Sequence, residues 1–258
     1  MKCVILAGGK GTRIAEESNI RPKPMVEVGG RPILWHIMKL YASFGVHEFI
    51  VCLGYKGYMV KEYFANYFLH EADVTFDMSN NRVEYHDCRS EPWRVTLVDT
   101  GEETMTGGRL LKVRNYLDPV EPFCMTYGDG LADIDIGAEI EFHRAQRCQA
   151  TVACVRPPAR FGRIALDGTR VGSFEEKPAI DGGLINGGFF VLQPAVLDLI
   201  GGAATVWENE PMEALAASRQ LAAWVHRGFW QPMDTLRDKL TLSGLWESGA
   251  APWKRWAG

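Results

Sequence analysis

The sequence lacks the features that mark several large classes of protein. None of its six cysteines forms a Cys-x-x-Cys pair, which excludes the commonest spacing of zinc ligands. No apolar run approaches the roughly 20 residues that cross a bilayer, and glycine ends the short apolar start before it reaches the length of a signal peptide's core. The net charge of −4 provides no overall basic field for nucleic acid. We therefore expect a cytoplasmic protein with no membrane or nucleic-acid partner, and cysteines within apolar runs agree with a reducing compartment.

The usual residues of nucleophilic catalysis are also missing as a recognisable set. The six histidines are scattered, with no His-x-x-x-His spacing, and no Ser/His/Asp or Cys/His constellation is evident. The Walker A phosphate loop is absent as well. Since the net charge provides no overall basic field either, any anionic ligand must be held by local groups.

The 258 residues otherwise have the composition of an ordinary globular protein, with 47% apolar and 23% charged residues. Short apolar runs that end in glycine alternate with runs of helical spacing, which predicts an α/β fold with parallel strands and right-handed crossovers. No repeat or linker divides the chain, so we expect one catalytic domain over residues 1–258. The predicted strands are 2–7, 49–53, 83–86, 94–98, 123–127, 151–155, several within 161–191, and 221–226; the predicted helices are 32–44, 58–68, 107–117, 136–147, 194–200, 210–218 and 235–246.

A glycine-rich turn follows the first predicted strand. Residues 8–13 read Gly-Gly-Lys-Gly-Thr-Arg. Glycines permit positive φ and let backbone N–H groups approach an anion closely, and Arg13 can bind phosphate oxygens in a bidentate way. The dinucleotide-binding fingerprint does not fit, because it requires glycine where this chain has Ile14. A tight turn without a ligand is the alternative, but Arg13 favours a phosphate site.

Lys23 stands between two prolines a short distance after this turn. Pro24 disfavours the helical region for the residue before it and so predicts an extended Lys23, while Pro22 stiffens the approach. A lysine whose backbone is already set loses less entropy when it binds an anion. An isolated Pro-Lys-Pro would favour a solvated surface turn; its position behind the glycine-rich turn favours a functional lysine.

Together these two segments resemble a known family. Leu-Ala-Gly-Gly-x-Gly-Thr-Arg at 6–13, followed by Pro-Lys-Pro-Met at 22–25, is similar to the signature of the sugar-1-phosphate nucleotidylyltransferases, also called sugar-nucleotide pyrophosphorylases. The resemblance implies a Rossmann-like fold with a mixed, mostly parallel sheet and helices on both faces, of the nucleotide-diphospho-sugar transferase type. It continues through Tyr-Gly-Asp at 127–129, Phe-Glu-Glu-Lys-Pro at 174–178, Asn-Gly-Gly-Phe at 186–189 and Phe-Trp-Gln-Pro-Met-Asp-Thr at 229–235.

Two aspartates are candidate ligands of a divalent cation. Nucleotidyl transfer needs charge neutralisation at the phosphates, and Mg²⁺ is usually held by one or two carboxylates with phosphate oxygens and water. Asp129 follows an apolar strand between two glycines, at the edge of the sheet where such folds bind ligands, although Gly-Asp-Gly also suits a plain turn. The residue pattern alone predicts that Asp234 caps a helix. The resemblance instead implies that it is the second Mg²⁺ ligand.

The resemblance also implies sugar-phosphate contacts. It assigns Lys177 to the phosphate and Glu176 to sugar hydroxyls, although a Glu-Glu-Lys run also suits a charged turn at a strand end. Pro178 predicts an extended Lys177. Asn186 is implied to contact the hexose, whereas its Asn-Gly-Gly setting also suits a hairpin turn.

The implied nucleotide contacts centre on the glycine-rich turn. Thr104 and Arg109 join them from the start of a predicted helix, where Arg109 could meet cytosine O2 or a phosphate; a plain helix start is the alternative. Arg13, Lys23 and Asp129 are the implied catalytic residues. The full implied nucleotide set is Leu6, Ala7, Gly8, Gly9, Gly11, Thr12, Arg13, Lys23, Thr104, Arg109 and Gly128.

Within the family, residues 57–70, 91–101 and 232–239 are most similar to the members that use CTP. The resemblance therefore implies cytidylyl transfer from CTP to glucose 1-phosphate, with Mg²⁺, giving CDP-glucose and pyrophosphate by direct displacement. It also implies a homo-oligomer, a hexamer, and a product that leads toward dideoxy sugars of surface polysaccharide. The alternatives are another nucleotide (dTTP, UTP or GTP), another hexose 1-phosphate, or a non-catalytic sensor that binds sugar nucleotides.

Overall fold

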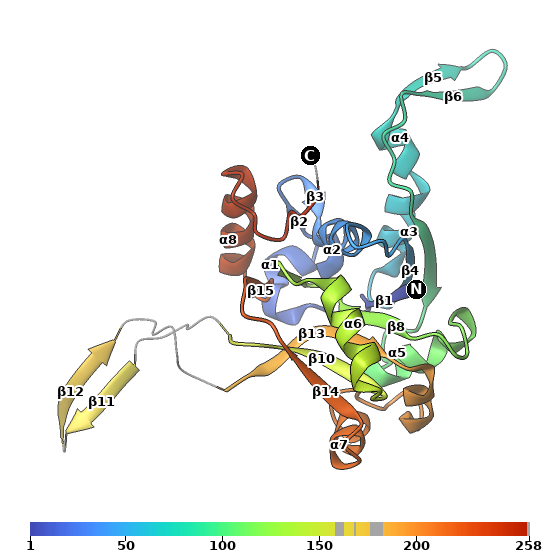
Figure 1. Cartoon of the computed structure of the whole chain (residues 1–258). Helices are drawn as coiled ribbons and strands as arrows, with labels where there is room; N and C mark the ends of the chain where they lie inside the picture. Colours follow the sequence, from blue (N-terminus) through green and yellow to red (C-terminus); the bar gives the residue numbers. More distant parts are fainter. Residues whose placement is uncertain (158–162, 168, 176–182, 257–258) are drawn as a thin grey trace.

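The fold is organised around a seven-stranded sheet (Figure 1). Its strands come from segments spread along the chain, from Lys2 to Val225. The computed structural model describes residues 1–157, 163–167, 169–175 and 183–256. The strand order is β14-β10-β13-β8-β1-β4-β7, and every strand but β13 runs in the same direction, which confirms the predicted mixed, mostly parallel sheet. The strands are β1 (Lys2–Leu6), β4 (Glu48–Leu53), β7 (Arg94–Asp99), β8 (Phe123–Tyr127), β10 (Ala150–Val155), β13 (Ile185–Leu192) and β14 (Leu221–Val225).

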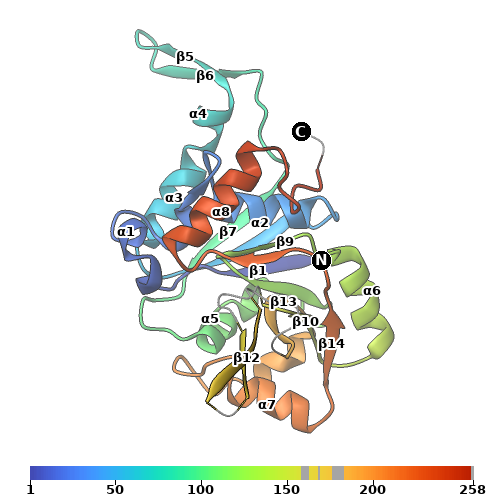
Figure 2. The same cartoon turned by 90° about the vertical axis from the view of Figure 1, so that its left-hand side faces the viewer.

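Both faces of the sheet are buried. Along β1, Cys3 and Ile5 belong to one hydrophobic core and Val4 and Leu6 to the other, as expected when successive side chains point to opposite faces. Helices supply the other half of each core (Figure 2), as predicted, and none within the described residues is long and apolar enough to cross a membrane. One face carries α2 (Ile33–Ala42), α3 (Gly57–Ala65), α6 (Ile136–Gln146) and α8 (Leu236–Glu247); the other carries α5 (Thr106–Lys112), η4 (Pro194–Leu199) and α7 (Glu210–Ala217).

Four two-stranded pairings lie outside the main sheet. The pairing of β9 with β15 matters for the site, because it brings a late segment of the chain beside the end of β8. The β5–β6 hairpin extends away from the body of the molecule (Figures 1 and 2). The pairs are β2 (Glu27–Val28) with β3 (Arg31–Pro32), β5 (Asp73–Asp77) with β6 (Arg82–His86), β9 (Gly130–Ala132) with β15 (Trp230–Pro232), and β11 (Arg163–Asp167) with β12 (Arg170–Glu175). The remaining short elements are η1 (Thr12–Ile14), α1 (Ala15–Ser18), η2 (Lys23–Met25), α4 (Tyr67–Glu71) and η3 (Arg114–Tyr116).

The prediction of one helix over 58–68 is wrong, because α3 and α4 are separate. Asn66 ends α3 with φ −99° and ψ 7°, outside the helical geometry. Its side-chain amide donates to the carbonyl oxygen of Glu62 at 2.9 Å. Asparagine competes in this way with the backbone hydrogen bonds of a helix, which the apolar spacing of the segment does not reveal.

Candidate active site

A cleft of about 700 Å³ opens at the carboxyl ends of β1 and β8. This is the edge at which open α/β sheets bind ligands. The predicted sugar-phosphate residues Glu176 and Lys177 lie outside the described residues. Every other predicted site residue lines the cleft: Leu6, Ala7, Gly8, Gly9, Gly11, Thr12, Arg13, Lys23, Thr104, Arg109, Gly128, Asp129, Asn186 and Asp234.

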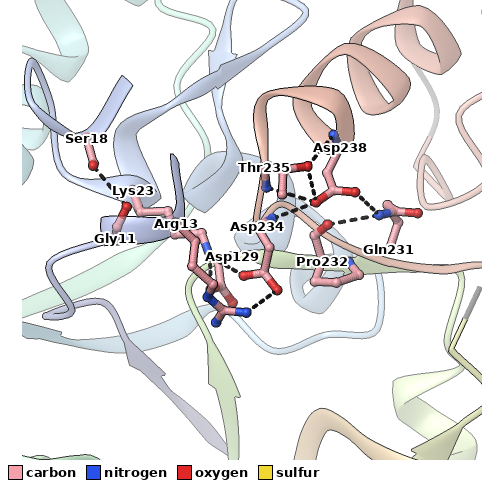
Figure 3. A network of polar contacts seen from close by, with 10 residues as sticks. All are labelled: Gly11, Arg13, Ser18, Lys23, Asp129, Gln231, Pro232, Asp234, Thr235 and Asp238. Atoms are coloured by element: carbon pink, nitrogen blue, oxygen red, sulfur yellow. Dashed lines mark hydrogen bonds and ion pairs between the residues drawn. The ribbon is translucent and has the colours of Figure 1, made fainter. Parts of the chain in front are cut away.

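Two cations and two carboxylates meet in this cleft (Figure 3). Lys23 Nζ lies 2.6 Å from Asp129 Oδ2 and 2.8 Å from Asp234 Oδ1. Arg13 Nη1 lies 2.7 Å from Asp234 Oδ2. The paired residues are 106, 211 and 221 positions apart in the sequence, so the fold alone assembles the cluster.

Burial and pairing act in opposite directions on Lys23. Its side chain is 9% exposed, and this burial disfavours the charged ammonium group. The charges and hydrogen bonds of Asp129 and Asp234 outweigh that effect and raise the pKa of Lys23 above its ordinary 10.5. Lys23 therefore keeps its positive charge, whereas the side chain of Arg13 is 72% exposed and can follow a ligand.

The β9–β15 pairing brings the two aspartates together. Asp129 directly precedes β9, Asp234 follows β15, and the backbone N–H of Met233 donates to the carbonyl oxygen of Asp129 at 2.8 Å. The prediction that Asp234 caps α8 is wrong, because Thr235 is the N-cap and forms a reciprocal capping box with Asp238. The carboxylate of Asp238 also accepts the Asp234 backbone N–H at 3.1 Å, so the Asp234 carboxylate is left to face the cations.

The predicted extended conformation of Lys23 is wrong as well. Lys23 is the first residue of η2, and the extended residue is Pro22, with φ −64° and ψ 148°. The N–H of Met25 donates to Pro22 O at 2.8 Å and that of Val26 to Lys23 O at 3.1 Å. Pro24 fits inside this turn because its fixed φ suits it and its missing N–H is not needed there. The turn and the ion pairs of Lys23 together override the local preference of a residue before proline.

Arg109 supports the glycine-rich turn from behind. Its buried guanidinium donates to Leu53 O at 3.0 Å, Thr100 Oγ1 at 2.6 Å, Gly8 O at 3.1 Å and Glu102 O at 3.1 Å. These bonds use all four hydrogens on the two terminal nitrogens and leave only Nε–H. A Cβ atom on Gly8 would lie 2.0 Å from Arg109 Nη1, so the close approach requires glycine at that position. A direct contact of Arg109 with the nucleotide stays a prediction.

Three acidic residues near the cleft were missed by the sequence analysis. Glu102 and Glu103 reach Lys10 Nζ, at 3.6 Å and 2.7 Å, across the rim. Glu208 accepts a hydrogen bond from Tyr127, which lines the cleft. No motif marks these residues, because each is recognised only through a partner far away in the sequence. The hairpin alternative for Asn186 is wrong, since this residue lies within β13.

The aspartate pair fits the chemistry of a magnesium site. Carboxylate oxygens are the ligands that Mg²⁺ prefers, and two of them suffice where phosphate oxygens and water complete the shell. Among the described residues, no group of three or more His, Cys, Asp and Glu side chains could hold a metal ion. The two carboxylates both pair with Lys23, so a cation held by them would take the rest of its shell from phosphate oxygens and water.

Comparison with solved structures shows the same fold. A putative glucose-1-phosphate thymidylyltransferase from Bacillus anthracis superposes with a TM-score of 0.71 at 17% identity, covering 100% of this chain and 97% of the other. An apo UDP-glucose pyrophosphorylase superposes with a TM-score of 0.69 at 15% identity, covering 96% and 98%. At this identity the likeness concerns the fold alone.

Sequence comparison shows the family. The chain is 60% identical over 256 residues to a glucose-1-phosphate cytidylyltransferase of Salmonella typhi, covering 99% of this chain and 100% of the relative. It is 43% identical over 257 residues to a probable glucose-1-phosphate cytidylyltransferase of Bacillus subtilis, again covering 99% and 100%. The family model described as nucleotidyl transferase matches residues 2–231. The chain therefore belongs to the nucleotidyl transferase family.

Proposed function

We propose that this protein transfers a cytidylyl group from CTP to glucose 1-phosphate and releases pyrophosphate, forming CDP-glucose. The observation that carries the proposal is the convergence of Arg13, Lys23, Asp129 and Asp234 in one cleft beside a glycine-rich turn. Paired cations and acids of this kind suit an anionic substrate with a divalent cation. The full-length relatives that bear the cytidylyltransferase name supply the choice of CTP and glucose 1-phosphate.

The reaction is a direct displacement at phosphorus. A phosphate oxygen of glucose 1-phosphate attacks the α-phosphorus of CTP, and the bond from that phosphorus to the bridging oxygen of pyrophosphate breaks. The attacking oxygen is already ionised near neutral pH, so no general base is needed. No histidine is found among the cleft residues that the structure describes. Catalysis then consists of positioning and charge stabilisation.

The residues of the cleft take complementary roles in this scheme. The backbone of the turn at Gly11 and Thr12 holds the phosphates, and Lys23 neutralises charge that develops on the α-phosphoryl group. Arg13 is exposed enough to accompany the leaving pyrophosphate. Asp129 and Asp234 would hold Mg²⁺, which when bound supplies charge neutralisation on the phosphate oxygens.

The sugar side of the scheme rests partly on resemblance. Asn186 lines the cleft and contacts the hexose in this proposal. Glu176 and Lys177 complete that side by resemblance alone. Thr104 and Arg109 contribute from the nucleotide side, Arg109 through Nε–H or by holding the turn.

Assembly and location form the least direct part of the proposal. We include a homo-oligomer, a hexamer by resemblance, and a cytoplasmic location. Large apolar side chains on the extended β5–β6 hairpin support assembly, since such groups favour burial. All six cysteines are free, which agrees with a reducing compartment. The exposed apolar side chains of the β5–β6 hairpin are Phe76, Met78, Val83 and Tyr85.

The test is a panel of CTP, dTTP, UTP and GTP, each with glucose 1-phosphate and with or without Mg²⁺, read by pyrophosphate release. We expect CTP to give the highest kcat/KM, and chelation of the metal to abolish turnover. A second panel holds CTP constant and varies the hexose 1-phosphate. Faster turnover with another nucleotide or hexose would replace the assigned substrate, and CTP binding without pyrophosphate release would indicate a sensor.

A further inference from the structure

Glu208 joins two sides of the cleft from outside it. This residue lies between η4 and α7, and its carboxylate accepts two hydrogen bonds. Tyr127 Oη donates to Oε1, and Thr106 Oγ1 donates to Oε2 at 2.6 Å. Tyr127 is the last residue of β8, and Thr106 is the first residue of α5, so one carboxylate ties together two elements that line the cleft.

The carboxylate determines the direction of the hydrogen bond from Asn186 to Tyr127. An ionised carboxylate only accepts, so Glu208 takes the single proton of the Tyr127 hydroxyl. The phenol oxygen is then an acceptor toward its other neighbour, and Asn186 Nδ2 donates to it at 3.3 Å. Burial and the charge of Glu208 raise the pKa of Tyr127 well above its usual value, so the phenol keeps its proton.

The amide of Asn186 is therefore held at both ends. Its Oδ1 accepts the backbone N–H of Gly188 at 2.8 Å, while Nδ2 donates to Tyr127. A flipped amide would lose both bonds. The two bonds leave one N–H and one oxygen lone pair of Asn186 for a ligand, which is one donor and one acceptor. That combination suits sugar hydroxyls, each of which can accept and donate.

We propose that Glu208 is a positioning residue for the hexose: through Tyr127 it fixes the amide orientation of Asn186 and thereby the recognition of sugar hydroxyls. This inference rests on the proposed function, in which Asn186 contacts glucose 1-phosphate. Glu208 itself touches no substrate in this scheme. Its effect is therefore expected on KM for the sugar phosphate rather than on the chemical step.

Glu208→Leu tests the inference, because leucine is of similar size and offers no acceptor. The Tyr127 hydroxyl proton then loses its carboxylate and can turn toward Asn186, which reverses the direction of their hydrogen bond. Thr106 Oγ1 loses its acceptor as well but still accepts the backbone N–H of Trp207 at 2.9 Å. At saturating CTP, we expect KM for glucose 1-phosphate to rise about tenfold while kcat changes less than about threefold.

Tyr127→Phe and the double variant show whether Glu208 acts through Tyr127. Since both changes break one chain of contacts, the double variant should raise KM no more than the more severe single variant. Glu208→Asp, which keeps an acceptor-only group, should recover part of the loss. Glu210→Leu, the same change at an exposed residue of α7, is the matched control and should leave KM unchanged. An unchanged KM in Glu208→Leu, or multiplicative effects in the double variant, would overturn the inference.

A readout without turnover separates this inference from the proposed function. The side-chain amide signal of Asn186 in an NMR spectrum should shift or broaden in Glu208→Leu and stay unchanged in Glu210→Leu. If the wild type releases no pyrophosphate from CTP and glucose 1-phosphate, the proposed function fails, whereas the amide signal still tests the chain of contacts. An unmoved Asn186 signal in a folded Glu208→Leu protein refutes the positioning role by itself.

Discussion

Two parts of the cleft are built in different ways. The contiguous part is the segment from Leu6 to Arg13, whose residues are neighbours in the sequence and follow one buried strand. The assembled part comprises Tyr127, Asn186 and Asp234, which come from three distant segments. Contacts behind the cleft hold the contiguous part, chiefly those of Arg109. The assembled part depends on a strand pairing, a capping box and the carboxylate of Glu208.

This difference distinguishes the residues that bring charged groups to the cleft from the contacts that place those groups. The contiguous part brings Arg13 and backbone N–H groups at a spacing that the sequence itself fixes. The assembled part brings Asp234 to Arg13 across 221 positions of sequence. A substitution in the assembled part can therefore act in two ways, by removing a charged group or by moving it.

Asp234→Asn tests the point where the two parts meet, and we expect the largest effect there. The asparagine keeps the shape of the side chain but removes the charge that pairs with Arg13 and Lys23 and that would bind Mg²⁺. The fold should persist while kcat falls by roughly 10²–10³-fold. Pyrophosphate release measures the activity, and thermal unfolding checks the fold.

Asp238→Asn provides the matched control four residues further on. Asparagine offers one acceptor oxygen in place of two, so either the cap contacts with Asp234 and Thr235 or the bond from Gln231 is lost, while the charge at the cations remains. We expect a loss of about 1 kcal/mol in the free energy of unfolding and less than about a tenfold loss in kcat. If both variants lost activity equally, placement rather than charge would be the main contribution of this segment.

The sequence predicted most of the fold and the contiguous part of the cleft. Strands such as β1 and β8 have uninterrupted apolar runs, because both faces of the sheet are buried. The glycine-rich turn is local chemistry and is legible in the same way. The errors of the sequence-based prediction were also local. The break at Asn66 and the turn at Lys23 each depend on hydrogen bonds that cannot be inferred from apolar spacing or from the preferences of residues next to proline.

The assembled part could be predicted only by resemblance. Residue pattern alone favoured a cap for Asp234, and one residue separates that interpretation from the observed cap at Thr235. Glu208 gave no signal at all, since its two partners lie 81 and 102 positions away. Long-range pairing of side chains follows from the packing of the whole chain, and no local spacing encodes it.

Arg109→Met tests the support of the contiguous part, with the second-largest expected effect. Arg109 is buried, with 5% of the residue exposed, and the change removes its four hydrogen bonds. The acceptors behind the glycine-rich turn are then left with fewer donors. We expect a loss of about 3 kcal/mol in the free energy of unfolding, measured by urea denaturation.

Arg114→Met is the control for this loss. Arg114 pairs with Asp198 on the surface, where the side chains are 45% and 70% exposed, so the same substitution should cost less than about 0.5 kcal/mol. Equal losses in the two variants would show that Arg109 contributes no more than an ordinary surface arginine. Crowding of Gly8 against the guanidinium would then need another explanation.

His36 tests the support of α8, and through it the assembled part. Its Nε2 lies 2.8 Å from Val28 O, and Nδ1 lies 3.3 Å from Trp253 Nε1, which can only donate. The ring also meets Trp246 of α8 edge to face at 4.6 Å. His36 is thus held neutral with Nδ1 as an acceptor, and protonation would set two N–H groups against each other. Burial lowers its pKa from 6.5 to about 4.

This pKa gives the sign of the effect. The unfolded chain binds a proton at His36 below its ordinary pKa of 6.5, whereas the folded protein does so only near 4, so the stability contributed by neutral His36 is present above 6.5 and lost as the pH falls toward 4. Between about pH 7.5 and about pH 5 the loss should be about 2 kcal/mol. Urea denaturation of the wild type, His36→Gln and the exposed control His86→Gln at both pH values measures it; only His36→Gln should lose this part of the pH dependence.

Hydrogen exchange then relates this small effect to the two parts of the cleft. The ring of His36 packs against Trp246 of α8 and against Trp253, and its hydrogen bonds go to Val28 and Trp253 rather than to the glycine-rich turn. Near pH 5 the amides of α8 should therefore lose protection before those of β1, and His36→Gln should remove the difference in pH dependence between them. If both elements lost protection together, the two parts of the cleft would unfold as one cooperative unit. The contacts that hold the assembled part would then give it no separate stability.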